Sequence, residues 1–261
     1  MMGCIIQARM GSTRLPGKVL KLVDNTNSSL YYTINQLKNC KGIDKIIVAT
    51  TTKEEDDVIV EYLQKLSIEH FRGNPTDVLD RYYACAKKFS VDSVIRITAD
   101  CPLIDPEIVD RGISIFKSGQ YDYVTNTFPR TFPDGNETEI FSFNALEIAW
   151  KNAILPSERE HVTPYFRNQK EKFKINNFEH TQDLSHLRWT MDLQEDLNLI
   201  RSIILKLDKH PIHLADILEL FNKNPELVKI NKGHIPNEGY MKSLKEDEEF
   251  LKSKNSSFFN P

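Results

Sequence analysis

The distribution of apolar and polar residues along this chain predicts strands that alternate with helices. Short apolar runs that end in polar residues predict strands at 3–8, 45–51, 68–73, 93–100 and 122–126. Apolar residues at helical spacing predict helices between these strands, at 28–40, 54–66, 76–89 and 106–118. This alternation is typical of a mixed, mostly parallel sheet with helices on both faces. We therefore expect an α/β fold.

The pattern changes between residues 127 and 145. Prolines and the turn pair Asp134-Gly135 stand there among aromatic and β-branched residues, which predicts a hairpin that leaves the main sheet. The remaining expected elements are helices at 141–153, 157–169, 194–207 and within 211–230, and strands at 173–180 and 187–192.

The end of the chain differs in composition from the rest. Residues 231–261 are polar with interspersed charges, and we expect an extension over the surface with a frayed end. The predicted organisation is therefore one domain over 1–230 and a polar C-terminal extension over 231–261.

Composition narrows the class of protein. The 261 residues have a formal net charge of −3 and are 40% hydrophobic, so a sizeable core is available without a general attraction to nucleic acid or anionic membranes. The four cysteines stand singly, which argues against a disulfide framework or a zinc site. Neither a membrane-spanning apolar run nor a signal sequence is evident. We expect a cytoplasmic protein with no nucleic-acid or membrane partner.

The stretch from residue 5 to residue 22, IIQARMGSTRLPGKVLKL, carries the first candidate chemistry. An apolar strand ends in a loop with two glycines, Gly11 and Gly17, and with the cationic residues Arg9, Arg14, Lys18 and Lys21. Glycines let backbone amides approach an anion, and the cations supply charge where a triphosphate would lie. The segment therefore predicts a phosphate or nucleotide site, although a basic surface loop after a buried strand would look similar.

Two predicted strands end in an aspartate. Asp100 closes RITAD, and Asp192 closes LRWTMD. Mg²⁺ in proteins typically takes one or two carboxylates, waters and substrate phosphate oxygens, which two such aspartates over a triphosphate would provide. Asp192 directly precedes a predicted helix, so capping of that helix is an alternative role.

Other polar residues permit two interpretations each. Thr50 and Arg72 end predicted strands and could contact a base, or could be an ordinary strand threonine and a solvated arginine. His161 lies in a charged helical stretch where a solvated face is the ordinary interpretation. Glu137 and Glu139 alternate on a predicted strand and could receive a hydroxyl-rich substrate or lie on a hairpin surface.

The chain resembles the spore-coat polysaccharide biosynthesis cytidylyltransferase-like family in five ordered segments: QARMGSTRLPGKVL, RGNPTDVLDRYY, RITADCPLIDPEIVD, EREHVTPY and LRWTMDLQEDLNLIR. That family is a branch of the acylneuraminate and deoxy-octulosonate cytidylyltransferases. The likeness runs from about residue 3 to residue 205. It implies a Rossmann-like nucleotide-diphospho-sugar transferase fold, CTP as the donor, Mg²⁺ as the cofactor, and a homodimer that pairs through the 127–145 excursion.

The resemblance also implies roles for individual residues. Arg14 and Lys18 would bind the phosphates, and Asp100 and Asp192 would hold the metal; these four form the predicted catalytic set. The predicted nucleotide-binding residues are Ala8, Arg9, Gly11, Arg14, Lys18, Thr50, Arg72, Asp77, Thr98 and Asp100. The predicted acceptor-binding residues are Asn126, Glu139 and His161. The run Asn136-Glu137 departs from the usual family pattern in the region that faces the acceptor.

The predicted reaction is transfer of CMP from CTP to an acceptor oxygen, with release of pyrophosphate. A nonulosonic-type sugar acid for surface glycans is the first choice among small anionic acceptors. Phosphonates, phosphorylated small molecules and sugar 1-phosphates are alternative acceptors on the same scaffold. A glycosyltransferase is a second hypothesis, weakened because an Asp-x-Asp motif is missing at the predicted strand ends. A non-catalytic nucleotide-binding protein is the third.

Overall fold

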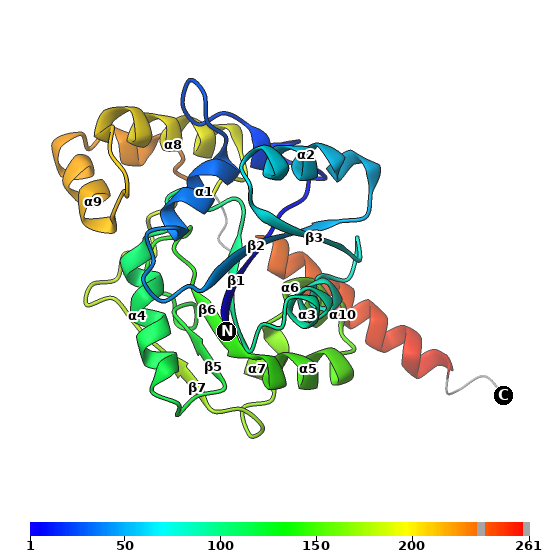
Figure 1. Cartoon of the computed structure of the whole chain (residues 1–261). Coiled ribbons are helices and arrows are strands. Elements are labelled where there is room, and N and C mark those ends of the chain that lie inside the picture. Colours follow the sequence, from blue (N-terminus) through cyan, green and yellow to red (C-terminus); the bar gives the residue numbers. More distant parts are fainter. Residues whose placement is uncertain (234–237, 258–261) are drawn as a thin grey trace.

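A seven-stranded sheet forms the centre of the molecule (Figure 1). The computed structural model describes the backbone of residues 1–233 and 238–257. The strand order is β3-β2-β1-β4-β6-β5-β7, and β6 runs antiparallel to both of its neighbours. The strands are β1 Met2–Gln7, β2 Lys45–Thr51, β3 Glu69–Gly73, β4 Ser93–Thr98, β5 Tyr123–Thr125, β6 Glu139–Ser142 and β7 Ile175–Asn177. The expected mixed, mostly parallel α/β sheet is confirmed.

Helices cover both faces of this sheet (Figure 1). The α-helices are α1 Ser29–Leu37, α2 Asp57–Lys65, α3 Val78–Lys88, α4 Pro106–Lys117, α5 Phe143–Asn152, α6 Pro156–His161, α7 Pro164–Asn168, α8 Gln194–Leu207, α9 Leu214–Lys223 and α10 Glu238–Ser257. Short 3₁₀ turns are η1 Lys18–Leu20, η2 Glu54–Asp56 and η3 Leu227–Lys229.

Each face of the sheet has its own apolar core. Ile6 of β1 packs in the core shared with α1, α4 and α8, whereas Ile5 packs in the core shared with α3 and α5. Successive strand side chains point to opposite faces, so a strand buried on both sides is a continuous apolar run. This is why the predicted strands could be recognised from short apolar runs.

Side-chain caps begin three of the helices. The side chain of Ser28 accepts a hydrogen bond from the Tyr31 N–H at the start of α1. Asp77 accepts from the Asp80 N–H at α3, and Asp105 accepts from the Glu107 N–H at α4, each at 2.8 Å. These caps satisfy amides that have no partner within the first helical turn.

The prediction of a strand at 187–192 was wrong. This segment is extended, but it forms one isolated bridge, between Arg188 and Asp134. Its amides bind loops instead of a strand: the Trp189 N–H donates to the Asp134 carbonyl at 2.8 Å, and the Met191 N–H donates to the Asp100 carbonyl at 2.8 Å. The apolar run that predicted a strand instead buries Trp189 and Met191 completely between loops.

The predicted excursion is also partly wrong, because β6 lies in the main sheet between β4 and β5. Ile140 and Phe141 of β6 enter opposite cores, which ties this strand to the sheet. Residues 126–138 form a long connection between β5 and β6. The helix expected at 141–153 begins at Phe143, where the Ser142 hydroxyl caps the Ala145 N–H at 3.1 Å.

Three further elements differ from their predicted extent. The helix expected at 157–169 divides into α6 and α7 because Val162 adopts a φ of 71°, and Pro164 starts the second helix. The strand expected at 173–180 is confined to β7. The 211–230 stretch forms α9 and η3.

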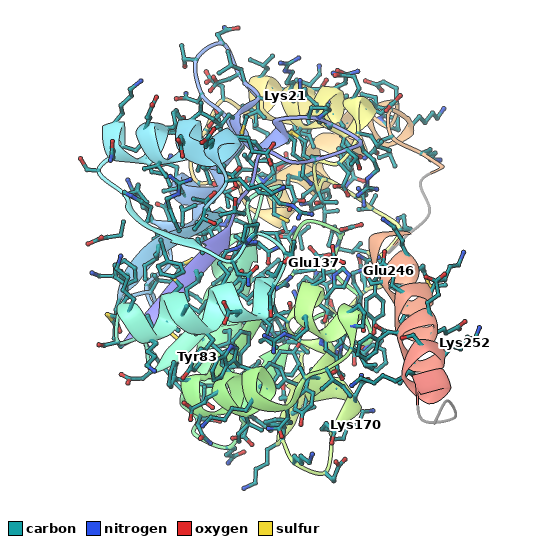
Figure 2. All side chains as sticks on the ribbon, turned by 90° about the vertical axis from the view of Figure 1, so that its right-hand side faces the viewer. Lys21, Tyr83, Glu137, Lys170, Glu246 and Lys252 are labelled. Carbon is teal, nitrogen blue, oxygen red and sulfur yellow. The ribbon has the colours of Figure 1, made fainter. Side chains whose placement is uncertain are left out.

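The polar C-terminal stretch forms a helix, α10, which packs along α6 (Figures 1 and 2). The Asp247 carboxylate of α10 accepts hydrogen bonds from the Ser157 N–H at 2.8 Å and the Ser157 hydroxyl at 2.5 Å. The stretch beyond residue 230 therefore contains a helix that packs on α6, and its description as a polar C-terminal extension stays a prediction. The last residues, 258–261, where fraying was expected, lie outside the described residues.

Candidate active site

The loop after β1 is held in place by its backbone. The Ala8 N–H donates to the Ala49 carbonyl at 3.1 Å, and the Met10 N–H donates to the Asp56 carboxylate at 2.6 Å. Gly17 has a φ of 65°, a conformation that side chains disfavour. Its turn directs the chain into η1, which begins with Lys18. The loop therefore presents Lys18 at the carboxyl edge of the sheet.

Lys18 joins the two aspartates that the sequence singled out. Its ammonium contacts the Asp100 carboxylate and lies 2.7 Å from Asp192 Oδ1. Arg14 Nη2 lies 3.1 Å from the same Asp192 oxygen. The Lys18 side chain is 14% exposed, so the contact is largely shielded from water. The four predicted catalytic residues thus meet at one place, and we call Asp100 and Asp192 the aspartate pair.

The charges at this place stabilise one another. Burial favours the protonated form of Asp192, but Lys18, Arg188 and Arg14 outweigh it and lower the pKa of Asp192 to about 2. Burial opposes the charge of Lys18, but the aspartate pair raises the pKa of this lysine above its ordinary value. At neutral pH both side chains are therefore charged, and Asp192 is in the form that binds a cation.

Arg188 fixes the orientation of Asp192. Its guanidinium donates to Asp192 Oδ2 at 2.7 Å, to Asp134 Oδ2 at 2.5 Å and to Asp196 Oδ1 at 3.3 Å. We call these four side chains the Arg188 clamp. This arginine is not among the site residues predicted from the sequence. The signal available was a charged residue within an otherwise apolar run, four positions before a candidate metal ligand.

The clamp also bears on the alternative role of Asp192, which was to cap the helix that follows it. The Asp196 carboxylate accepts the N–H groups of Asp192 and Leu193, both at 3.0 Å, at the start of α8. The Asn231 amide holds Asp196 from the other side at 2.8 Å. Capping of α8 therefore falls to Asp196, and the Asp192 carboxylate faces cationic side chains instead.

Glu137, labelled in Figure 2, lies in the connection between β5 and β6, and Arg130 links it to Asp134 of the clamp. Its carboxylate accepts the Gly135 N–H at 2.8 Å and lies 3.2 Å from Arg130 Nη1. Burial and the charge of Asp134 raise the pKa of Glu137 to about 8, against the opposing effect of Arg130. A carboxyl that titrates near neutral pH beside fixed charges is a candidate acid–base group. From the sequence, Glu137 could either contact a hydroxyl-rich substrate or lie on the surface of a hairpin.

Gly135 allows this connection to pack against the 187–192 segment. It has a φ of 109°, and a Cβ there would lie 2.8 Å from the Thr190 nitrogen and 2.9 Å from the Trp189 carbonyl carbon. Only glycine fits such a close approach of two backbones. The turn pair that predicted a hairpin therefore brings Asp134 to Arg188.

The predicted nucleotide-binding residues surround the loop unevenly. Arg9 and Gly11 are exposed, and Ala8 is buried beneath them. Within the described structure, Thr50 Oγ1 and Gln7 Oε1 are buried at the ends of β2 and β1 without a hydrogen-bond partner. These atoms are the polar groups at this edge that a ligand could satisfy.

Three other predicted nucleotide contacts already have protein partners. Arg72 Nε donates to the Thr51 carbonyl at 3.0 Å, and its guanidinium also pairs with Asp57 at 2.6 Å. Asp77 caps α3 and binds Arg159 Nε at 2.8 Å. The Thr98 hydroxyl lies 3.2 Å from the Cys101 sulfur.

The predicted acceptor residues bind neighbouring protein groups rather than the aspartate pair. Asn126 is buried, and its amide spans the Asn136 carbonyl and the Thr138 N–H, each at 2.8 Å. Glu139 is buried with Arg96 Nη1 at 2.5 Å and contacts the Tyr123 hydroxyl.

His161 Nε2 lies 3.0 Å from the Ser243 hydroxyl of α10. Burial lowers the pKa of this histidine, against the raising effect of Glu160. Asn126 and Glu139 thus bind groups of the protein and His161 lies at the contact with α10, and their contact with an acceptor stays a prediction.

The donor set of the aspartate pair suits Mg²⁺. Two carboxylates converge on a single cationic group, and Mg²⁺ commonly takes one or two carboxylates with waters and phosphate oxygens. Among the described residues, a second possible metal-binding group consists of Asp105, Glu107 and His213. Their potential ligand atoms all lie within 4.8 Å of one another. Asp105 already caps α4 there and accepts the Leu214 N–H at 2.7 Å, so this group joins two helix starts.

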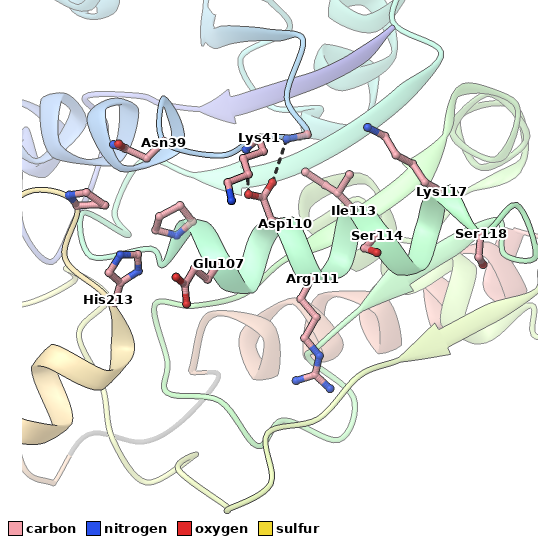
Figure 3. Close-up of a pocket in the computed structure, with 13 residues that line it drawn as sticks. Asn39, Lys41, Glu107, Asp110, Arg111, Ile113, Ser114, Lys117, Ser118 and His213 are labelled. Atoms are coloured by element: carbon pink, nitrogen blue, oxygen red, sulfur yellow. Dashed lines mark hydrogen bonds between the residues drawn. The ribbon is translucent and has the colours of Figure 1, made fainter.

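The cavity beside that group is separate from the aspartate pair. It has a volume of about 950 Å³ and lies along α4, lined by Asn39, Lys41, Asp110 and Arg111 among others (Figure 3). Lys18 and the aspartate pair are absent from its lining. In the part of the chain that the structure describes, no helix has the length and apolar character needed to cross a membrane.

Comparisons with known proteins agree with this geometry. The sequence profile of a family described as cytidylyltransferase matches residues 3–228. The chain is 33% identical over 232 residues to the spore coat polysaccharide biosynthesis protein SpsF of Bacillus subtilis, across 85% of this chain and 94% of that protein. It is 29% identical over 175 residues to 3-deoxy-manno-octulosonate cytidylyltransferase 2 of Hydrogenovibrio crunogenus, across 60% of this chain and 66% of that protein.

A solved structure extends the likeness to three dimensions. A cytidylyltransferase from Leptospira borgpetersenii superposes with a TM-score of 0.84 at 35% identity, across 90% of this chain and 99% of that chain. The nucleotidyltransferase fold and the family implied by the sequence motifs are thereby confirmed. The chain belongs to the cytidylyltransferase family and is a CTP-dependent nucleotidyltransferase.

Proposed function

We propose that the protein transfers CMP from CTP to the oxygen of a small anionic acceptor, with Mg²⁺ as cofactor. The acceptor oxygen bonds to the α-phosphorus and loses its proton, while the bond from that phosphorus to the bridging oxygen of pyrophosphate breaks. The observation that carries the proposal is the meeting of Lys18, Arg14 and the aspartate pair behind a glycine-containing loop. Cations and carboxylates at one point are what a metal-bound triphosphate requires.

The residues would act by position and charge. Arg14 and Lys18 would bind the β- and γ-phosphates and stabilise the charge that accumulates on departing pyrophosphate. Asp100 and Asp192 would hold Mg²⁺, which when bound supplies charge stabilisation at the α-phosphate and makes the acceptor hydroxyl more acidic. The Arg188 clamp would keep Asp192 in its binding orientation.

We also propose that the acceptor is a sugar acid of the nonulosonic type, used in surface glycan synthesis. The relatives named as a spore coat polysaccharide biosynthesis protein and as a 3-deoxy-manno-octulosonate cytidylyltransferase support this class. Arg130 and Arg188 line a cavity of about 490 Å³, but Asp134 lines it too and pairs with both arginines, so the support for this class of acceptor comes from the relatives.

A pyrophosphate-release assay tests the reaction. Each of the four nucleoside triphosphates is offered with Mg²⁺ and a panel of sugar acids, phosphonates, phosphorylated small molecules and sugar 1-phosphates. We expect release with CTP and a sugar acid. Release with another triphosphate but not with CTP would refute the donor, and release with a different acceptor class would refute the acceptor.

Substitutions at the aspartate pair test the metal assignment. Asp100→Asn and Asp192→Asn keep the shape but remove the charge, so each should abolish turnover while CTP binding stays within about tenfold. Turnover and equilibrium CTP binding are measured on the same preparations. Undiminished turnover in both variants would remove the aspartate pair from the reaction.

A homodimer remains our proposal for the assembly. Of the aromatic residues in the 127–145 region, Phe132 and Phe141 are buried in the protomer, whereas Phe128 is 57% exposed. Arg167 and Lys170 lie over the Phe128 ring at 5.6 and 5.8 Å. An exposed aromatic ring rimmed by cations is a common feature of protein interfaces.

A further inference from the structure

Lys18 occupies an unusual position for a phosphate-binding lysine. Its ammonium lies between the two carboxylates that suit a divalent cation, at 2.7 Å from Asp192 Oδ1 and in contact with Asp100. Both carboxylates and the lysine are largely buried, at 16%, 20% and 14% exposure of their side chains. A charge buried in this way needs its partners, because an unpaired buried ion is costly.

We infer that, in the nucleotide-free protein, the ammonium of Lys18 occupies the cation position between the aspartate pair. Lys18 must move away before a divalent cation can bind to these two carboxylates. The inference rests on the proposed function for the identity of the nucleotide. Lysine and metal are mutually exclusive because they require the same carboxylate oxygens. The lysine can leave only when another anion accepts its charge, and the triphosphate supplies one.

The contacts of the Arg188 clamp indicate that Lys18, and not Arg188, moves when a divalent cation binds. Arg188 is held by three carboxylates and itself holds Asp192 Oδ2, so Asp192 presents its other oxygen, Oδ1, to Lys18. Arginine in a network of this kind is fixed by its planar geometry, whereas lysine has a flexible stem with one compact charge. The exchange therefore moves Lys18 and leaves the metal ligands in place.

This exchange predicts coupling between the two ligands. A triphosphate that draws Lys18 away frees the aspartate pair for the cation, and a bound cation in turn frees Lys18 for the phosphates. Coupling of this type is reciprocal and commonly amounts to about 5–150-fold in affinity. The protein would then bind nucleotide and metal more tightly together than it binds either one alone.

The experiment measures equilibrium binding of Mn²⁺ through the electron paramagnetic resonance signal of the free ion, on the full chain. Without nucleotide, Lys18→Met and Lys18→Gln should each bind Mn²⁺ about fivefold or more tightly than the wild type. Lys38→Met removes one positive charge at the exposed end of α1, away from the phosphate loop, and should leave Mn²⁺ affinity unchanged. CTP should tighten Mn²⁺ binding to the wild type much more than to the Lys18 variants, after subtraction of Mn²⁺ bound to CTP alone.

Two results would overturn the inference. One is equal Mn²⁺ affinity in the wild type and in both folded Lys18 variants without nucleotide. The other is retention of the tighter binding when Asp100→Asn is added to Lys18→Met, since the ion would then lie elsewhere. Because the nucleotide-free comparison uses no CTP, tighter Mn²⁺ binding together with failure of CTP to bind would refute the donor assignment and leave the exchange intact.

Discussion

At the scale of single residues, the candidate site is a network of charges in which each carboxylate has a cationic partner. Lys18 and Arg14 face one oxygen of Asp192, and Arg188 holds the other. Such networks depend on geometry because a buried charge loses its hydration and must recover that energy from fixed partners. Substitutions that keep the charge but change the geometry are therefore the informative ones.

We expect Arg188→Lys to lower turnover and to raise the Mg²⁺ concentration needed for activity, each by about 10–100-fold. Lysine retains the charge but cannot donate to three carboxylates at once, so Asp192 would lose its fixed orientation. The Mg²⁺ dependence of CTP consumption measures the effect. Arg201→Lys is the matched control on α8, since Arg201 binds the Leu22 carbonyl away from the clamp. An unchanged Mg²⁺ dependence in Arg188→Lys would contradict a positioning role.

Glu137 gives a prediction about stability and pH. Its pKa is raised from 4.5 to about 8, so between these values the folded chain keeps a proton that the unfolded chain has released. The folded state binds more protons in this window, and the free energy of unfolding therefore falls as pH rises through it. Glutamine does not titrate, so Glu137→Gln should lack this loss of stability. The free energy of unfolding of the variant should therefore rise relative to that of the wild type as pH increases from 5 to 8.

Urea unfolding of both proteins at several pH values measures this difference. Glutamine can still accept the Gly135 N–H, which makes it the conservative replacement. Parallel stability profiles for the two proteins across this pH range would show that the pKa of Glu137 is not raised.

At the scale of elements, the C-terminal helix α10 completes α6 rather than trailing from the domain. α6 spans Pro156–His161 and ends at Val162, whose φ is 71°, and its N-cap residue, Leu155, offers no side-chain cap to the first N–H groups. Asp247 of α10 supplies partners for the N–H and the hydroxyl of Ser157 at the start of α6. A side chain from a distant segment therefore acts as the cap that the local sequence lacks.

Asp247→Ala should lower the free energy of unfolding by about 1–2 kcal/mol, because Ser157 loses both partners. Denaturant unfolding measures the loss, and hydrogen exchange should show faster exchange in α6 and α10. Glu248→Ala, at the next and exposed position of α10, should have little effect. If the two substitutions cost the same, the contact with Ser157 does not stabilise the fold.

At the scale of the whole molecule, the sheet gathers the site at one edge. β1 and β4 are adjacent and parallel, so the loop after β1 and Asp100 after β4 emerge side by side. Ligands of such sheets bind beyond the carboxyl ends of the strands. The 187–192 segment then passes across this edge and adds Asp192.

The proposed dimer belongs to this scale. Phe128→Glu should convert a dimer to a monomer if Phe128 lies in the interface, because a charge replaces the exposed ring. Ile154→Glu is the control, since Ile154 is also 57% exposed but lies outside the 127–145 region. Sedimentation velocity distinguishes the two states. A wild-type monomer at all concentrations would refute the homodimer, and a dimer that persists in Phe128→Glu would place the interface elsewhere.

The sequence by itself determined the parallel strands β1 to β4, most helices and the proximity of the loop after β1 to Asp100. Strands buried on both faces leave continuous apolar runs, and helices leave periodic ones, so both are local signals. Adjacent parallel strands bring their carboxyl ends together, and this is sufficient to predict that Lys18 lies near Asp100.

Only the tertiary structure decided the parts that depend on long-range contacts. An extended segment and a strand have the same local pattern of apolar residues. The sequence of 187–192 therefore could not show that this segment forms a single bridge at Arg188 and not a strand of the sheet. Likewise, α10 looked like a polar tail because its buried groups, Ser243 and Asp247, are polar residues whose partners lie far away in the chain. The spacing of apolar residues predicts which apolar side chains are buried. It does not predict the burial of polar side chains that form hydrogen bonds with residues far away in the chain.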